Sequence, residues 1–224
     1  VPDVNVVDII KHILKCEGKE FETGTIEQAL KESLFPQSNL PILARLVYNE
    51  IVENFQYDNI KTRLIAHLSN HKDIKSLYES YLRRLSVRFG EELVRKALSL
   101  LWCSKYGLAL NDLRSMLTDA RLEDLFYMVY QEFGRDGQER MKFGHRYLYD
   151  TVESLYCKND DFVRTCRNLI VNQFEKSVDD DTTILLEVAY QLDELRDEER
   201  MYKLLLNLKN ACSIYQYDYY LMAK

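Results

Sequence analysis

The chain has 224 residues, of which 46% are hydrophobic and 29% are charged, and its formal net charge is −6. This balance is typical of a globular protein and excludes a long disordered chain. The negative charge disfavours nucleic acid as a partner, because a phosphate backbone attracts clustered Lys and Arg. No apolar run is long enough to span a membrane, and the early acidic residues are not typical of a signal peptide. We therefore expect a cytoplasmic protein without membrane contact.

The first third of the chain has the periodicity of short helices. The composition includes only 7 Gly and 3 Pro, and this scarcity of turn residues predicts a mainly α fold. Apolar residues at helical spacing predict helices over residues 4–15, 26–35, 40–55 and 60–68. The polar segment SNHKD at residues 69–73 then indicates a linker. A first helical domain is expected over residues 1–71.

The pattern of predicted elements changes in the middle of the chain. Helices are predicted over residues 74–89 and 91–106, followed by two short helices at 111–117 and 122–126 that are joined by a tight turn. The runs YMVYQEF and MKFGH flank GRDGQER, and this pattern predicts one β-hairpin. Helix, helix–turn–helix and hairpin is the order of a winged helix. We expect this winged-helix domain over residues 72–158.

The last third is predicted to be helical again. Its helices are expected at residues 146–156, 160–175, 182–195 and 198–208, before a Tyr-rich tail. Successive helix pairs of this kind are typical of solenoids. Residues 159–224 are therefore interpreted as the start of an α-superhelix.

The sequence contains no complete motif for catalysis or metal binding. Its five cysteines are odd in number and form no CxxC pair, which favours reduced, partly buried thiols. His67 and His71 are four residues apart, but Ser69 is expected to end their helix, so no metal site is predicted. Gly18 precedes Lys19 without the earlier glycine or the hydroxyl of a phosphate-binding loop. We expect that the chain is not itself an enzyme.

DNA binding is a weaker alternative that the winged helix raises. Its recognition helix would lie at residues 120–129, where acidic residues outnumber basic ones. An acidic face would repel phosphates. Intramolecular docking is the better interpretation of this domain.

Several segments resemble a known family. SNLPILARLVYNEIV resembles the GLPL-type motif in the first helical domain of NACHT and NB-ARC regulatory NTPases, the STAND class. LVRKALSLLWCSKYGLALNDLRSML resembles their winged-helix domain, and KFGHRYLYDTVESLY is similar to the segment after the wing. LLEVAYQLDELRDEERMYKLLLNL resembles the start of the superhelical region of nephrocystin-like members.

The resemblance implies a nucleotide site shared with a P-loop domain upstream in the same chain. ADP or ATP would bind to the longer parent protein, and no cofactor is expected for this chain alone. Pro41 would pack against adenine, and His145 would contact the β-phosphate of ADP and hold the closed state. Asn39 replaces the family's glycine, and His145 is flanked by Gly and Arg rather than by Met and Asp. By themselves, Pro at a first helical turn and a lone His are also ordinary structural features.

The resulting hypothesis is a regulatory lid or lever of a nucleotide-switch signalling NTPase, hinged near residues 69–73. The resemblance also allows an oligomer on activation. The alternative is a helical adaptor that binds protein partners through its C-terminal third, where four tyrosines cluster: Tyr215, Tyr217, Tyr219 and Tyr220. Aromatic residues are frequent interface anchors, although a final helix packed on the preceding pair would also explain them.

Overall fold

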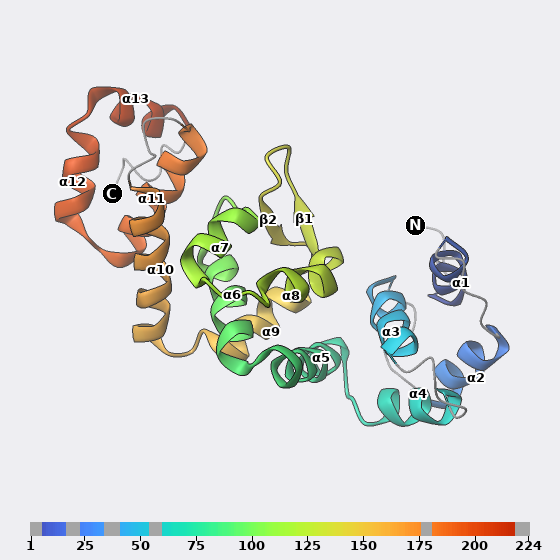
Figure 1. Cartoon of the computed structure of the whole chain (residues 1–224). Helices are drawn as coiled ribbons and strands as arrows, with labels where there is room; N and C mark the ends of the chain where they lie inside the picture. The colour runs from blue at the N-terminus through green and yellow to red at the C-terminus, as the bar shows by residue number, and fades with distance from the viewer. Residues whose placement is uncertain (1–5, 17–22, 34–40, 54–59, 176–180, 218–224) are drawn as a thin grey trace. The chain divides into compact units, whose positions relative to one another are not determined.

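The computed structural model describes residues 6–16, 23–33, 41–53, 60–175 and 181–217. This part of the chain is mainly α-helical with one two-stranded antiparallel hairpin, which confirms the predicted fold class (Figure 1). The chain divides into two compact units, Val1–Tyr81 and Leu82–Lys224. Each unit is described by itself below. The first unit extends beyond the expected boundary at residue 71, so the predicted hinge segment lies inside it.

Within the described residues, the first unit contains four helices and the beginning of a fifth. Its helices are α1 (Val6–Cys16), α2 (Thr23–Ser33), α3 (Pro41–Glu53), α4 (Ile60–Ser69) and the first part of α5 (Ile74–Phe89). Helix α1 packs on α3, and α2 packs on α4. Fully buried aliphatic side chains fill this unit, among them Ile10, Ile26, Leu43 and Leu64. Their helical spacing is the reason that the sequence predicted these helices.

The segment between α4 and α5 is fixed by local hydrogen bonds. The backbone N–H of Ser76 donates to Asp73 Oδ1 at 2.8 Å, and the backbone N–H of Asp73 donates to Ser76 Oγ at 3.2 Å. This reciprocal pair caps the start of α5. At the end of α4, the N–H of His71 donates to the carbonyl of Leu68 at 3.2 Å.

The second unit begins with a winged helix. Its elements are α6 (Glu91–Cys103), α7 (Leu110–Leu117), α8 (Leu122–Val129), the 3₁₀ turn η1 (Tyr130–Glu132), β1 (Phe133–Arg135), β2 (Met141–Phe143) and α9 (Arg146–Tyr156). In the hairpin, Phe133 pairs with Phe143. An antiparallel bridge also joins Leu108 to Met141, with N···O distances of 3.3 and 2.9 Å. Leu108 therefore supplies the short third backbone segment that precedes the helix–turn–helix.

Gly107 allows that bridge to form. Its φ is 88°, a conformation that L side chains rarely adopt. A Cβ at this position would lie 2.9 Å from the carbonyl oxygen of Met141. The close approach of the hairpin to the loop after α6 therefore requires glycine.

Two predicted boundaries in this region were wrong. The run at residues 127–133 was expected to be a strand, but its first six residues complete α8 and form η1. Leu122, Leu125, Phe126 and Val129 are all buried, and this i, i+3, i+4, i+7 pattern favours helix over strand. Helix α6 ends at Cys103 rather than at residue 106, because a carboxylate from a distant helix binds the N–H groups that follow it.

The C-terminal helices pack in succession. They are α10 (Asp160–Phe174), α11 (Thr182–Leu195), α12 (Glu198–Leu205) and α13 (Leu208–Tyr217). Helix α10 packs on both α6 and α11, and α11 contacts α12 and α13. A small apolar cluster centred on Leu185, Ala189 and Ile214 joins α11 to α13. The side chains of Asn159, Asp181 and Asp197 cap the starts of α10, α11 and α12.

Candidate functional site

His145 lies at the foot of the wing. It is the N-cap residue of α9 with φ −138°, and its side chain makes no capping hydrogen bond. The N–H of Gly144 donates to the carbonyl of Glu132 at 2.8 Å, which anchors the chain just before His145. The imidazole is partly exposed. The predicted contact between His145 and a phosphate therefore has a fixed backbone and an accessible side chain, and it stays a prediction.

An aromatic stack supports α9, the helix that follows His145. Tyr149, one turn further along α9, stacks on Trp102 of α6 with ring centroids 5.7 Å apart. Tyr149 also meets Phe143 of β2 edge-to-face at 5.8 Å. Such pairs add to the stability that burial alone supplies. The stack fixes the direction in which α9 leaves the wing.

Pro41 is the first residue of α3, as the preference of proline for that position predicts. Its side chain lies outside what the structure describes, and its predicted adenine contact stays a prediction. Pro41 belongs to the first unit and His145 to the second. No geometry therefore joins these two predicted site residues.

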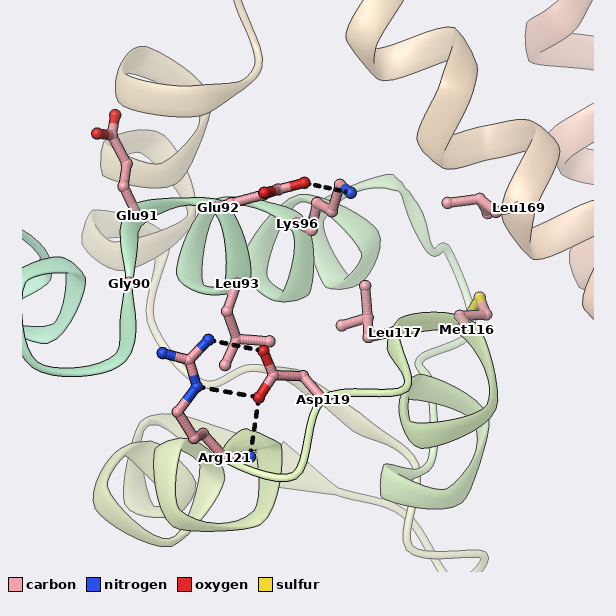
Figure 2. A pocket seen from close by; sticks show the side chains of 10 residues that line it. All are labelled: Gly90, Glu91, Glu92, Leu93, Lys96, Met116, Leu117, Asp119, Arg121 and Leu169. Atoms are coloured by element: carbon pink, nitrogen blue, oxygen red, sulfur yellow. Dashed lines mark hydrogen bonds and ion pairs between the residues drawn. The ribbon is translucent and has the colours of Figure 1, made fainter.

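A groove of 560 Å³ opens in the second unit (Figure 2). It lies between the start of α6, the turn from α7 to α8, and α10. Aliphatic side chains and one thioether line part of it: Leu93, Met116, Leu117 and Leu169. The sequence analysis missed this groove because its walls are up to about 80 residues apart in the chain. In the sequence, the glycine at position 90 separates two predicted helices, and it marks one edge of this groove.

Two ion pairs lie among the residues that line the groove. Lys96 Nζ lies 2.7 Å from Glu92 Oε1, and Arg121 Nη2 lies 2.8 Å from Asp119 Oδ2. Hydrogen bonds from Arg121 lower the pKa of Asp119 to about 2. A hydrogen bond from Lys96 lowers the pKa of Glu92. The residues that line this groove include no His, Cys, Ser or Thr. The groove therefore combines aliphatic side chains with paired charges.

A buried polar junction joins α11 to the end of α6. Glu187 is only 2% exposed. Its carboxylate accepts hydrogen bonds from Tyr106 N at 2.7 Å and from Ser104 Oγ at 2.9 Å. It also accepts a bond from Gln191 Nε2 at 2.6 Å. Burial raises the pKa of Glu187, and these donors act in the opposite direction.

Gln191 and Arg167 extend the junction to α10. Gln191 Nε2 donates to the backbone carbonyl of Cys103 at 2.7 Å, and Gln191 Oε1 accepts from Arg167 Nη1 at 2.9 Å. Arg167 is 7% exposed and also pairs with Glu194 at 2.9 Å. Three helices therefore share one network of satisfied buried polar groups, an arrangement that fixes a unique geometry.

An ion pair also joins the wing to α11. Arg140, in the hairpin turn, is 8% exposed, and its Nη2 lies 2.5 Å from Asp181 Oδ2 at the start of α11. The wing and the end of α6 both contact α11 through charged groups. Polar groups therefore connect α11 to the winged helix at two separate places.

The recognition helix of the winged helix carries acidic and aromatic side chains. Helix α8 exposes Glu123, Asp124 and Tyr127. The nearby Arg114 hydrogen-bonds to Glu123, and Arg121 is bound to Asp119. Neither arginine is therefore available to a phosphate without losing its carboxylate partner. This surface disfavours nucleic acid.

The two histidines that the sequence analysis considered lie close together in the first unit. His71 Nδ1 is 2.5 Å from the carbonyl oxygen of His67, and the ring centroids are 4.7 Å apart. His67 Nε2 also lies 3.7 Å from Glu50 Oε2. Within the described ranges, no group of three His, Cys, Asp or Glu side chains has a geometry that could hold a metal ion.

Comparisons with protein-family models, with curated proteins and with solved structures find no significant match to this chain. Among the helices that the structure describes, none has both the length and the apolar character needed to cross a bilayer.

Proposed function

We propose that this chain is the regulatory lever of a nucleotide-switch NTPase, whose P-loop domain would precede it in a longer protein. In the ADP state the winged helix closes over the nucleotide through His145. On exchange with ATP, the winged helix and the C-terminal helices swing away together. A switch of this kind needs two arrangements that a ligand stabilises differently.

The observation that carries this proposal is the buried junction around Glu187. A lever transmits movement only if its parts move as one body. Glu187, Gln191 and Arg167 are buried and connect the end of α6 to α10 and α11, and the hydrogen bonds made by Gln191 are buried as well. Breaking a buried network of this kind leaves polar groups unsatisfied. The network therefore resists bending between the winged helix and the helices that follow it.

The position of His145 supports the nucleotide part of the proposal. A partly exposed imidazole at the N-cap position of a helix has the reach to donate to a phosphate oxygen. The exposed backbone N–H groups of a helix start also favour anions. A winged helix that exposes acidic rather than basic side chains on α8 suits docking against protein better than docking against DNA.

The test begins with the residues encoded upstream of Val1. We expect a phosphate-binding loop followed by a strand that ends in acidic residues. The longer protein should then retain ADP during purification, and His145→Ala should release most of it. Arg146→Ala is the matched control, since the Arg146 side chain is 91% exposed. An upstream sequence without a phosphate-binding loop would overturn the proposal.

A helical adaptor is the second candidate. The observation in its favour is the exposure of Tyr215 and Tyr217 on α13, which are 59% and 63% exposed, and of Tyr202 on α12 and Leu206 directly after it, each 66% exposed. Exposed aromatic residues on adjacent helices are typical of partner surfaces. If Tyr202→Ser lowers binding of an identified partner without lowering thermal stability, the adaptor is favoured. A loss of stability alone would indicate packing.

A further inference from the structure

The last part of α5 carries two arginines, a serine and a valine in close succession. The segment LRRLSVRFG covers residues 82–90 and lies in the second unit. Arg83 and Arg84 stand three and two residues before Ser86. Val87 follows the serine directly, and its side chain is 89% exposed. Arg83 is exposed as well. Solvent therefore reaches an arginine before Ser86 and an apolar side chain after it.

This order of residues suits serine kinases that select basic substrates. Such a kinase lines its substrate cleft with carboxylates, which attract arginines on the N-terminal side of the serine, and an apolar pocket takes the residue that follows. The planar guanidinium of arginine pairs with a carboxylate through two parallel hydrogen bonds. Ser86 is the only serine in the sequence that follows two arginines at these positions. The charge pattern therefore singles out Ser86.

The hydroxyl of Ser86 has a structural role in the unmodified chain. Ser86 Oγ lies 3.2 Å from the hydroxyl oxygen of Tyr156, so one hydrogen bond joins α5 to α9. Tyr156 is 9% exposed, and Ser86 is half-buried. Leu85 and Phe89, on the same turn, are buried. The closed turn therefore shields the hydroxyl, and it must open before a kinase can transfer a phosphoryl group.

Gly90 sets the point at which this turn opens. Helix α5 ends at Phe89, and Gly90 follows with a φ of 91° before α6 begins. The N–H of Gly90 donates to the carbonyl of Ser86 at 2.9 Å, and this bond closes the turn. Terminal turns of helices open at a smaller cost in free energy than whole domains. Opening at Gly90 frees Ser86 together with Val87 and gives the extended backbone that a kinase cleft holds.

We propose that Ser86 is a phosphorylation site for a serine kinase that selects basic substrates, and that the phosphate keeps the last turn of α5 from packing again on α9. In the transfer, Ser86 Oγ attacks the γ-phosphorus of ATP. An O–P bond forms, the bond from this phosphorus to the β–γ bridging oxygen breaks, and ADP leaves. The hydroxyl proton passes to the catalytic carboxylate of the kinase.

The effect on α5 follows from the charge of the phosphate. A phosphoserine carries a charge of about −1.5 to −2 at pH 7, whereas the hydroxyl that it replaces is neutral. At Ser86 this charge lies in the last turn of a helix, where the partial charge of the helix dipole is also negative. The phosphate would also have to lose water to occupy the place of the hydroxyl beside Tyr156. Both effects favour the open turn, and neither depends on a nucleotide-binding domain upstream.

The experiment uses the whole chain, Mg-ATP and the catalytic subunit of cyclic-AMP-dependent protein kinase as the probe. Tryptic peptides are followed by mass spectrometry over time. We expect phosphate on the peptide of residues 85–88, in which Ser86 is the only residue with a hydroxyl. The phosphorylated chain should unfold roughly 2–8 °C lower, because it loses the hydrogen bond with Tyr156. Hydrogen exchange should rise in residues 82–89 more than in α11 to α13.

Variants test recognition and release separately. Arg83→Ala combined with Arg84→Ala should slow the phosphorylation of Ser86 about tenfold or more. Arg88→Ala removes an exposed arginine after the serine and should change the rate by less than about twofold. Tyr156→Phe removes the hydroxyl but keeps the ring, so it should speed phosphorylation by weakening the closed turn. Equal rates with and without the two arginines, or a slower rate in Tyr156→Phe, would contradict the proposal.

Ser99 is an internal control for the folded state. It follows Arg95 and Lys96 on α6, but it is fully buried. Phosphate on Ser99 as fast as on Ser86 would show that the kinase acts on unfolded chain, and this would overturn the proposal. An unmodified Ser86, under conditions in which a synthetic peptide of residues 82–90 is phosphorylated, would overturn it as well. Phosphorylation with an unchanged melting temperature and unchanged exchange in residues 82–89 would overturn the release of α5.

Discussion

Replacing Glu187 with Ala tests the buried junction most sharply. The carboxylate is 2% exposed and accepts bonds from Tyr106 N, Ser104 Oγ and Gln191 Nε2. Its removal takes the acceptor from these donors and from Lys105 N, while Gln191 Nε2 retains its bond to the carbonyl of Cys103. Each unsatisfied donor costs about 1–3 kcal/mol, less whatever water and relaxation recover. We therefore expect Glu187→Ala to lower the free energy of unfolding by about 3–5 kcal/mol.

The assay is urea denaturation followed by circular dichroism and by the fluorescence of Trp102, the only tryptophan in the chain. Glu198→Ala is the matched control, because Glu198 is an exposed glutamate in the first turn of α12. Surface changes of that kind usually alter stability by less than about 0.5 kcal/mol. In hydrogen exchange, Glu187→Ala should increase exchange in α11 to α13 more than in α7 to α9. A loss below about 1 kcal/mol, equal to that of the control, would refute the reasoning.

Further predictions concern pH, the backbone and the core. Because burial raises the pKa of Glu187 above 4.5, the folded state holds this proton more tightly, so its contribution to stability is full below pH 4.5 and falls as pH rises through the raised pKa. Glu187→Gln should remove this pH-dependent component. The measurement is the free energy of unfolding of both proteins, from denaturation curves across this pH range, and a difference between them that does not change with pH would contradict the prediction. Gly107→Ala should lower the free energy of unfolding by about 1–3 kcal/mol, because the new Cβ would lie 2.9 Å from the carbonyl oxygen of Met141. Gly134→Ala is the control, because a Cβ there has open space. Equal melting temperatures of the two variants would contradict this prediction. Phe126→Ala should cost about 3–5 kcal/mol in chemical denaturation, and Tyr127→Ala, at 81% exposure, should cost far less; a reversed order would show that α8 is misassigned.

The local parts of the fold could be predicted from the sequence because periodicity reports burial directly. Ile10, Leu43 and Leu64 lie at helical spacing and are all buried. The hairpin was found because Gly-containing turn residues separate two aromatic runs. Its first strand was predicted too early because Tyr127 and Val129 favour either a strand or a short amphipathic helix. The burial of α8 in the structure resolves that ambiguity, whereas the pattern of the sequence is compatible with both a helix and a strand.

The long-range parts could not be predicted, because they depend on pairs that are far apart in the chain. Glu187 is a charged residue in a helical pattern, and the sequence gives no sign that its carboxylate ends α6 at Cys103. The burial of Cys103 and Cys166 likewise follows from the packing of α6 on α10. The sequence did predict that these thiols are partly buried. His145 lies directly after the wing, where the hairpin pattern placed it.

The central claim is that the winged helix and the C-terminal helices move as one body when nucleotide is exchanged. Fluorescence energy transfer in the longer protein, with its other exposed cysteines removed, measures this directly. One dye pair would be placed at Tyr127→Cys on α8 and Tyr202→Cys on α12, positions that are 81% and 66% exposed. A second pair would join the exposed Asp8→Cys on α1 to the α8 position. Exchange of ADP for ATP should change the transfer of the second pair and leave that of the first unchanged. A change in the first pair, or no change in either, would contradict the lever.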